Sequence, residues 1–317
     1  MLKRFAFRSF LLASAAVALM AQVPPPYREP ETPDPHPFKL SVETTLVLIP
    51  VTVTDATNHF VLGLTKDNFT LLENGKRQNV KNLSGEDAPL SVGLLVDLSG
   101  SMTMKLDISR QAVTEFLRTM NPQDEAFLVD FSDRANLSVP FTHKFSQIES
   151  KLGTMESQGL TALIDAVHLG LDEMKKSHNP RKALLIISDG GDNNSQYTAK
   201  EVEELVRLAD VQVYSMGVFE RLPYRIPALE EISGPHLLSE LSEQTGGRVF
   251  SASRASVLPG IARQIGVELR NQYVLAYTPS DEERNGKYRR VEVQLSTPEG
   301  LSALKARWRT GYYAPRQ

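Results

Sequence analysis

The chain has 317 residues, of which 41% are hydrophobic and 23% charged, enough to bury one sizeable core and a second small one. Its formal net charge is −3, and it falls to −6 without residues 1–21, because these contain three basic residues and no acid. An acidic chain of this kind is a poor binder of phosphate backbones, so we expect no nucleic-acid partner. Cysteine is absent, which excludes disulfides, thiol nucleophiles and thiolate metal sites.

The first residues have the layout of an export signal. Lys3, Arg4 and Arg8 precede an uncharged apolar stretch from Phe10 to Ala21. This pattern predicts a secretory signal peptide over residues 1–21 and an exported protein, periplasmic or secreted. The stretch is shorter than the roughly 20 residues of a membrane helix, so we expect no stable membrane span after cleavage; an uncleaved anchor is the alternative. Prolines recur between 24 and 37, which predicts an extended linker over residues 22–38.

The next segment favours β structure. Thr45–Thr54 is rich in β-branched residues and predicts a strand, and a second strand is expected at Phe69–Glu73. The second strand leads into Asn74-Gly75, and Asn-Gly between strands is a strong signal for a tight hairpin. Residues 39–88 are therefore expected to form a small β unit.

From Leu90 onward, short apolar runs alternate with segments of helical periodicity. The expected strands are Ser91–Val96, Ala126–Phe131, Ala183–Ser188, Val211–Val218 and Arg248–Ser251. The expected helices are Leu106–Met120, Phe145–Met155, Leu163–Met174, Glu201–Ala209, Leu237–Gln244 and Val257–Leu269. Continuous apolar strands alternating with helices predict an α/β domain over residues 89–270, with a doubly wound, mostly parallel sheet covered on both faces.

Beyond this domain the alternation stops and β signals return. Strands are expected at Gln272–Thr278, Tyr288–Leu295 and Ser302–Arg309, with a turn at Asn285-Gly286 and another at residues 298–300. Small isolated sheets are marginally stable, and neither flank alone offers more than a few strands. We therefore expect residues 271–317 to pack with residues 39–88 as a small flanking β domain; two separate additions to the α/β domain are the alternative.

Three polar segments follow or precede elements of the predicted sheet. Asp97, Ser99 and Ser101 come at the end of one apolar strand, Thr161 stands just before a helix, and Asp189 ends another apolar strand. In open α/β sheets ligands bind beyond the carboxyl ends of the strands, so these side chains are expected at one edge. All five offer oxygen, which selects Mg²⁺, Mn²⁺ or Ca²⁺. The alternative is that they are ordinary turn and capping residues.

Together these segments resemble the metal-ion-dependent adhesion site of von Willebrand factor type A (VWA) domains. The pattern Asp-x-Ser-x-Ser is followed by Gly-x-Thr and then Ser-Asp-Gly, and all five positions occur in the family's order. The resemblance implies a Rossmann-like VWA fold. It also implies that Ser99, Ser101 and Thr161 contact the metal directly, whereas Asp97 and Asp189 often act through water. A protein partner presenting Asp or Glu would complete the coordination of Mg²⁺.

The flanks carry a second resemblance. Segments 62–69, 272–279 and 309–315 are similar to the flanks of exported bacterial VWFA-related domain proteins. This resemblance supports an architecture and implies no activity. Asp192 and Asn193, which follow the third site segment, are interpreted as turn-forming residues.

Three functions are compatible with the sequence. The first is a metal-dependent protein-binding module, and the second is a structural scaffold of an envelope assembly that does not use metal. The third is a hydrolase that uses the same ion as a Lewis acid. No general base is placed near the site, and the chain has neither Gly-x-Ser-x-Gly nor His-Glu-x-x-His. We therefore expect a binding module and no enzyme.

Overall fold

The computed structural model describes residues 46–85, 88–219, 229–298 and 303–316. The chain divides into two compact units, Met1–Glu43 and Thr44–Gln317, and all described residues belong to the second. The expected signal peptide and proline-rich linker lie outside the described residues. None of the helices in the described ranges is long and apolar enough to cross a membrane.

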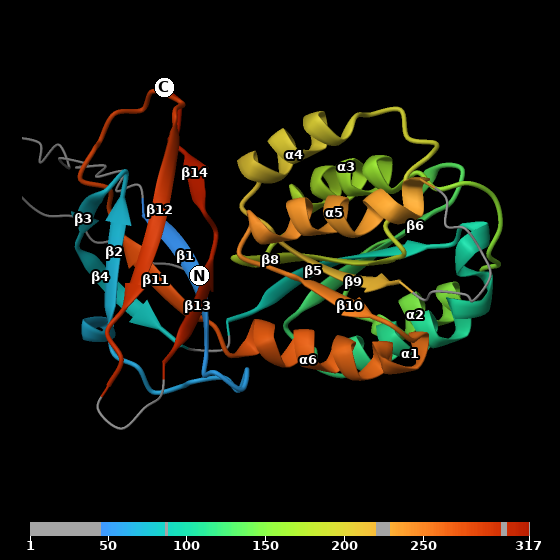
Figure 1. The fold of residues 1–317 in the computed structure, drawn as a ribbon, viewed down its shortest axis with the longest axis horizontal. Coiled ribbons are helices and arrows are strands. Elements are labelled where there is room, and N and C mark those ends of the chain that lie inside the picture. The colour runs from blue at the N-terminus through green and yellow to red at the C-terminus, as the bar shows by residue number, and fades with distance from the viewer. Residues whose placement is uncertain (1–45, 86–87, 220–228, 299–302, 317) are drawn as a thin grey trace, which may run out of the picture. The chain divides into compact units, whose positions relative to one another are not determined.

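A six-stranded sheet with the order β10-β9-β8-β5-β6-β7 forms the centre of the α/β domain (Figure 1). All neighbours run parallel except β6 and β7, which are antiparallel. The strands are β5 (Leu90–Asp97), β6 (Glu125–Phe131), β7 (Ala135–Thr142), β8 (Arg181–Ser188), β9 (Gln212–Val218) and β10 (Val249–Ala252). This confirms the expected α/β fold with a mostly parallel sheet.

Helices cover both faces of this sheet, with α3, α4 and α5 on one side and α1, α2 and α6 on the other (Figure 1). Successive side chains of a strand point to opposite faces, so Leu94 packs in the core beneath α1 whereas Leu95 packs in the core beneath α3. All residues of β5 are buried, which explains its continuous apolar sequence. The helices are α1 (Leu106–Leu117), α2 (Phe145–Gly153), α3 (Leu163–Met174), α4 (Ala199–Leu208), α5 (Leu229–Glu243) and α6 (Leu258–Arg270).

The structure differs most from the sequence-based expectation in two elements of this domain. Strand β7 is not expected from the sequence, because it contains Pro140 and polar residues. Such a strand is tolerated only at the edge of a sheet, and β7 is an edge strand. Helix α5 begins eight residues earlier than expected, at Leu229 instead of Leu237, and includes Pro235. Proline inside a helix is unusual because it lacks the N–H that an interior helical residue donates, and the sequence predicts only the part of the helix that follows it.

Strands from both flanks of the α/β domain form two four-stranded antiparallel sheets. One has the order β13-β1-β11-β4 and the other β14-β12-β2-β3. Strand β1 pairs with β11 and β13, and β2 pairs with β12, so each sheet combines N-terminal and C-terminal segments. The strands are β1 (Val47–Thr54), β2 (Phe69–Glu73), β3 (Lys76–Gln78), β4 (Val80–Ser84), β11 (Tyr273–Tyr277), β12 (Tyr288–Leu295), β13 (Lys305–Trp308) and β14 (Gly311–Tyr313).

The two small sheets share one apolar core, to which β1 contributes Ile49 and β12 contributes Val293. On β12 buried and exposed residues alternate, as expected for a sheet with one solvated face. The expected hairpin at Asn74-Gly75 is confirmed. It joins β2 and β3, and both of its residues have positive φ, 49° and 79°, as a two-residue hairpin of this type requires.

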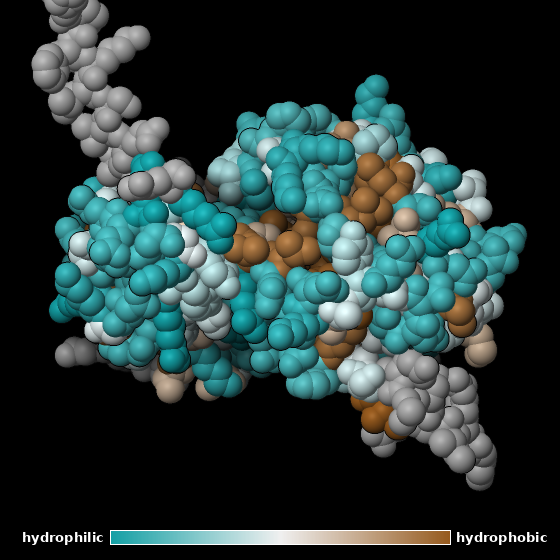
Figure 2. Space-filling model, turned by 90° about the horizontal axis from the view of Figure 1, so that it is seen from above, coloured by the Kyte–Doolittle hydropathy of each residue, from teal (hydrophilic) through white to brown (hydrophobic). Residues whose placement is uncertain are grey.

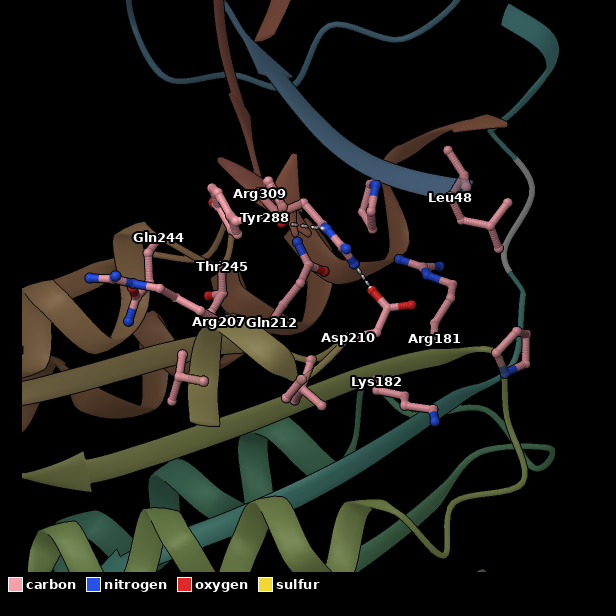
Figure 3. A pocket seen from close by; sticks show the side chains of 17 residues that line it. Leu48, Arg181, Lys182, Arg207, Asp210, Gln212, Gln244, Thr245, Tyr288 and Arg309 are labelled. Carbon is pink, nitrogen blue, oxygen red and sulfur yellow. Dashed lines mark hydrogen bonds and ion pairs between the residues drawn. The ribbon is translucent and has the colours of Figure 1, made fainter. Parts of the chain in front are cut away.

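Polar contacts join the β sheets to the α/β domain. The carboxylate of Glu268 on α6 is fully buried and accepts hydrogen bonds from Arg248 (2.7 Å), from Tyr214 (3.3 Å) and from Arg307 of β13 (3.4 Å). A cavity of about 50 Å³ lies at the same junction, where Figure 3 shows the ion pair of Arg309 with Asp210.

The face in Figure 2 is largely hydrophilic, with hydrophobic side chains exposed in a hollow near its middle.

Candidate metal centre

The carboxyl ends of β5 and β8 lie side by side in the middle of the sheet, which brings two of the expected site segments together. Asp97, the last residue of β5, is fully buried. Its Oδ1 accepts a hydrogen bond from the backbone N–H of Ser99 (2.8 Å), and its Oδ2 accepts one from the hydroxyl of Ser188 on β8 (2.6 Å). Asp97 is therefore fixed from its own loop and from the neighbouring strand.

The loop after β5 holds two serine hydroxyls next to each other. The Oγ atoms of Ser99 and Ser101 are 3.1 Å apart. Ser99 is buried and Ser101 is exposed, so the pair leads from the buried carboxylate to the surface. The short 3-10 helix Gly100–Lys105 begins within this loop and continues into α1. Hydrogen bonds thus connect Asp97 to the backbone N–H of Ser99, and the hydroxyl of Ser99 to that of Ser101.

The loop that contains Thr161 packs against the serine loop. The backbone N–H of Gly100 donates to the carbonyl oxygen of Gly159 (3.0 Å), and the hydroxyl of Ser157 donates to the carbonyl oxygen of Ser99. Thr161 itself is 5% exposed and donates its backbone N–H to the side chain of Asn193 (2.9 Å). The second expected segment is therefore held at the same edge of the sheet as the first.

The loop after β8 completes the arrangement. Asn193 and Asn194 donate their backbone N–H groups to the carbonyl oxygen of Thr161 (3.0 and 3.1 Å). Asp192 accepts hydrogen bonds from the N–H of Ile164 (2.9 Å), in the first turn of α3, and from the hydroxyl of Ser195 (2.6 Å). The side chains of Asp192 and Asn193 were interpreted as turn-forming, and in the structure they also join this loop to the Thr161 loop.

Asp189 has a partner that the sequence analysis did not identify. Its Oδ2 accepts a hydrogen bond from the ammonium group of Lys105 (3.2 Å), which also contacts the carbonyl oxygen of Val218 (3.5 Å). The side chains of Lys105 and Asp189 are 14% and 9% exposed. Lys105 lies only four residues after Ser101. This closeness to the serine loop is the sequence feature that could have identified it.

Close backbone packing holds Asp189 in position. Gly190 has a φ of 81°, and a Cβ atom there would lie 2.7 Å from the carbonyl carbon of Gly234 on α5. Both the positive φ and the close approach require glycine at position 190. The N–H of Gly190 donates to the hydroxyl of Ser188 (2.9 Å), which also bonds to Asp97. Ser188 therefore links the two carboxylate segments; the sequence places it in the Ser-Asp-Gly pattern but does not reveal this role.

Burial dominates the electrostatics of the site. Removal from water raises the pKa of the Asp97 carboxyl from 3.8 to about 6, although its hydrogen bonds from Ser188 and Ser99 act in the opposite direction. The charge of the nearby Asp189 makes a smaller contribution to this rise in pKa. A buried carboxylate with a second one close by gains stability from a cation. The site is therefore suited to positive charge.

The donor set fits a hard cation. Two carboxylates and three hydroxyls are oxygen ligands of the type that Mg²⁺, Mn²⁺ and Ca²⁺ prefer. Within the described ranges, no three or more His, Cys, Asp and Glu residues form a cluster that could hold a metal ion. A metal at this edge would consequently depend on the serine and threonine hydroxyls as well as the two carboxylates.

Comparisons with known proteins agree with this architecture. Residues 92–191 match the family model described as von Willebrand factor type A domain. A VWA structure from Catenulispora acidiphila superposes with a TM-score of 0.50 and 11% sequence identity, covering 78% of this chain and 72% of that one. This structural similarity shows the fold.

Two curated relatives align with part of the chain. An uncharacterized protein of Borreliella burgdorferi is 22% identical over 200 residues, which are 56% of this chain and 58% of the relative. The human voltage-dependent calcium channel subunit alpha-2/delta-2 is 23% identical over 147 residues, which are 43% of this chain and 13% of the subunit. The chain thus spans less than two thirds of the length of either relative.

Proposed function

We propose that this chain, which contains a von Willebrand factor type A domain, is an extracytoplasmic module that binds a protein partner through a divalent cation. Mg²⁺ is the favoured ion, with Mn²⁺ and Ca²⁺ as alternatives of the same chemistry. The oxygen atoms of Asp97, Ser99, Ser101, Thr161 and Asp189 would hold it. When bound, the cation supplies a coordination position for an Asp or Glu side chain of the partner.

The observation that carries this proposal is the joining of three separate segments around the buried carboxylate of Asp97. Hydrogen bonds connect Asp97 to Ser99 and Ser188, and the serine loop to the loop of Thr161. Burying a carboxylate without a countercharge costs free energy, so proteins rarely do so without a gain elsewhere. A bound cation would provide that gain, because it favours the ionised form of Asp97.

Lys105 supports the fit of a cation. Its ammonium group bonds to Asp189, so the chain itself places a positive charge at the rim of the site. Exposed Ser101 places a hydroxyl where a ligand from another molecule can approach. Both features support a cation that is held by the carboxylates and reached by a partner from the surface.

The proposed location rests on the N-terminal sequence. Basic residues followed by a short apolar stretch are typical of a secretory signal peptide, and the recurrent prolines that follow suit an extended tether. The proposal assigns no catalysis to the site, since the binding role needs only an ion with an accessible coordination position.

Calorimetric titration of the protein with Mg²⁺, Mn²⁺ and Ca²⁺ tests the metal site directly. The wild type should bind with one-to-one stoichiometry, and Ser99→Ala together with Ser101→Ala should abolish the binding heat. Ser146→Ala is a matched control, because Ser146 is an exposed serine on α2. A wild type that gives no heat and no change in melting temperature with millimolar cations would refute the metal site. Partner binding that persists unchanged in EDTA would favour the scaffold.

A further inference from the structure

Lys105 lies at the rim of the proposed metal site and is not part of the five-residue motif. It is the last residue of the short 3-10 helix that begins at Gly100, and its side chain turns back toward the end of β8. There its ammonium group donates to Asp189 Oδ2 (3.2 Å) and lies 3.5 Å from the carbonyl oxygen of Val218 at the end of β9. Lys105 thus connects the serine loop to two neighbouring strands.

The environment of Lys105 is unusual for a lysine. The ammonium group is strongly hydrated and normally stays in water, yet this side chain is only 14% exposed. A buried lysine is stable when it is paired, and here the pair is with a carboxylate that is 9% exposed. In the described structure the charge of Asp189 is therefore balanced from within the chain.

We propose that Lys105 is an internal competitor of the metal ion, which holds Asp189 until a divalent cation binds and then releases it. The inference rests on the proposed metal binding. The same carboxylate cannot give its full attraction to both cations, and the ammonium and the metal repel each other at this short range. Lys105 therefore determines the affinity of the site.

The competition also determines which cations the site accepts. Coulomb attraction grows with the charge of the ion, so a divalent cation gains about twice as much from the two carboxylates as a monovalent one. Na⁺ and K⁺ carry the same charge as the ammonium group that is already bonded to Asp189, whereas Mg²⁺ carries twice that charge. Lys105 lowers the affinity for both kinds of ion, so a monovalent ion, whose attraction to the carboxylates is weaker, is the first to be excluded from Asp189.

Calorimetric titration of the full chain with MgCl₂ tests this role. Lys105→Met removes the charge and keeps the length of the side chain. The Kd of this variant for Mg²⁺ should be roughly tenfold or more below that of the wild type. Lys105→Arg keeps the charge and should bind within a few-fold of the wild type. Lys151→Met, at an exposed lysine of α2, should leave the Kd unchanged. A folded Lys105→Met variant that binds Mg²⁺ no more tightly than the wild type would overturn the competition.

A second measurement uses the unmodified chain and does not depend on the folding of a variant. Acetylation of lysines, followed by mass spectrometry, should modify Lys105 slowly in EDTA and several-fold faster in saturating Mg²⁺, whereas Lys151 should react equally in both. Equal protection of Lys105 in both conditions would show that it is not displaced. If neither the wild type nor Lys105→Met binds Mg²⁺, the proposed function itself fails. If the wild type binds but these differences are missing, only the role of Lys105 fails.

Discussion

Replacing Asp97 with asparagine should make the metal-free protein more stable at neutral pH, although it removes a central residue of the proposed site. The amide has the shape of the carboxylate, and it can accept from Ser99 N–H and donate to Ser188 Oγ. It carries no charge, so it does not incur the cost of burying one. The expected gain in stability follows from the pKa of the carboxyl.

Burial raises the pKa of Asp97 from 3.8 to about 6. Well below pH 3.8 this carboxyl is protonated in both the folded and the unfolded chain, and it imposes no penalty. As the pH rises from about 4 to 6 the unfolded chain releases the proton first, so the wild type loses stability, and the loss is complete above the folded pKa. A difference of about 2 in pKa corresponds to about 3 kcal/mol, which is the upper limit of the expected gain for Asp97→Asn at pH 7.

Urea denaturation in EDTA between pH 4 and pH 8 measures this effect. The difference in unfolding free energy between Asp97→Asn and the wild type should be small at pH 4 and should grow to a plateau above pH 6. Asp67→Asn, at an exposed carboxylate, should show no such trend. In saturating Mg²⁺ the wild type should recover stability and the variant should not, because a cation favours the ionised form. A difference that is constant across the pH range would refute burial as the cause.

Three further substitutions test how the site and the domain junction are held. Gly190→Ala should lower the unfolding free energy, measured by urea denaturation, by at least about 2 kcal/mol. The reason is that φ is 81° and the new Cβ would lie 2.7 Å from the backbone of Gly234. Ser188→Ala should lower it by about 2 kcal/mol in EDTA at pH 7.5, since Asp97 loses a hydrogen-bond donor. Glu268→Ala should cost about 3 kcal/mol by the same measurement, because it leaves the partly buried Arg248 and Arg307 at the junction without their carboxylate.

Matched controls separate these effects from general sensitivity. Gly153→Ala, at the end of α2 where a Cβ would meet nothing within 4 Å, should be as stable as the wild type or more so. Asp172→Ala removes a half-exposed ion pair with Lys175 and should cost less than about 1 kcal/mol. Equal urea midpoints for Gly190→Ala and Gly153→Ala would contradict the close packing at position 190. A loss for Glu268→Ala as small as that for Asp172→Ala would contradict the buried network.

Local patterns in the sequence were sufficient for most elements. The continuous apolar run of β5 reflects burial on both faces of the sheet, and the periodic run of α3 reflects burial of one face of a helix. Burial can therefore be read directly from the residue types. Polar residues at strand ends, and Thr161 just before a helix, likewise indicated that Asp97, Ser99, Ser101, Thr161 and Asp189 lie at one sheet edge. Whether they bind a metal remains a prediction.

Other features depend on contacts between residues far apart in the chain, and no local pattern encodes them. Strand β7 is stable only because β6 offers it an edge, and β1 finds its partners more than 200 residues away in β11 and β13.

The same holds inside the site. The sequence by itself determined the fold class and the oxygen donors, because both follow from the order of apolar and polar residues. The tertiary structure decided that Ser188 holds Asp97 and that Lys105 neutralises Asp189, because these contacts form only when β5, β8 and β9 lie side by side.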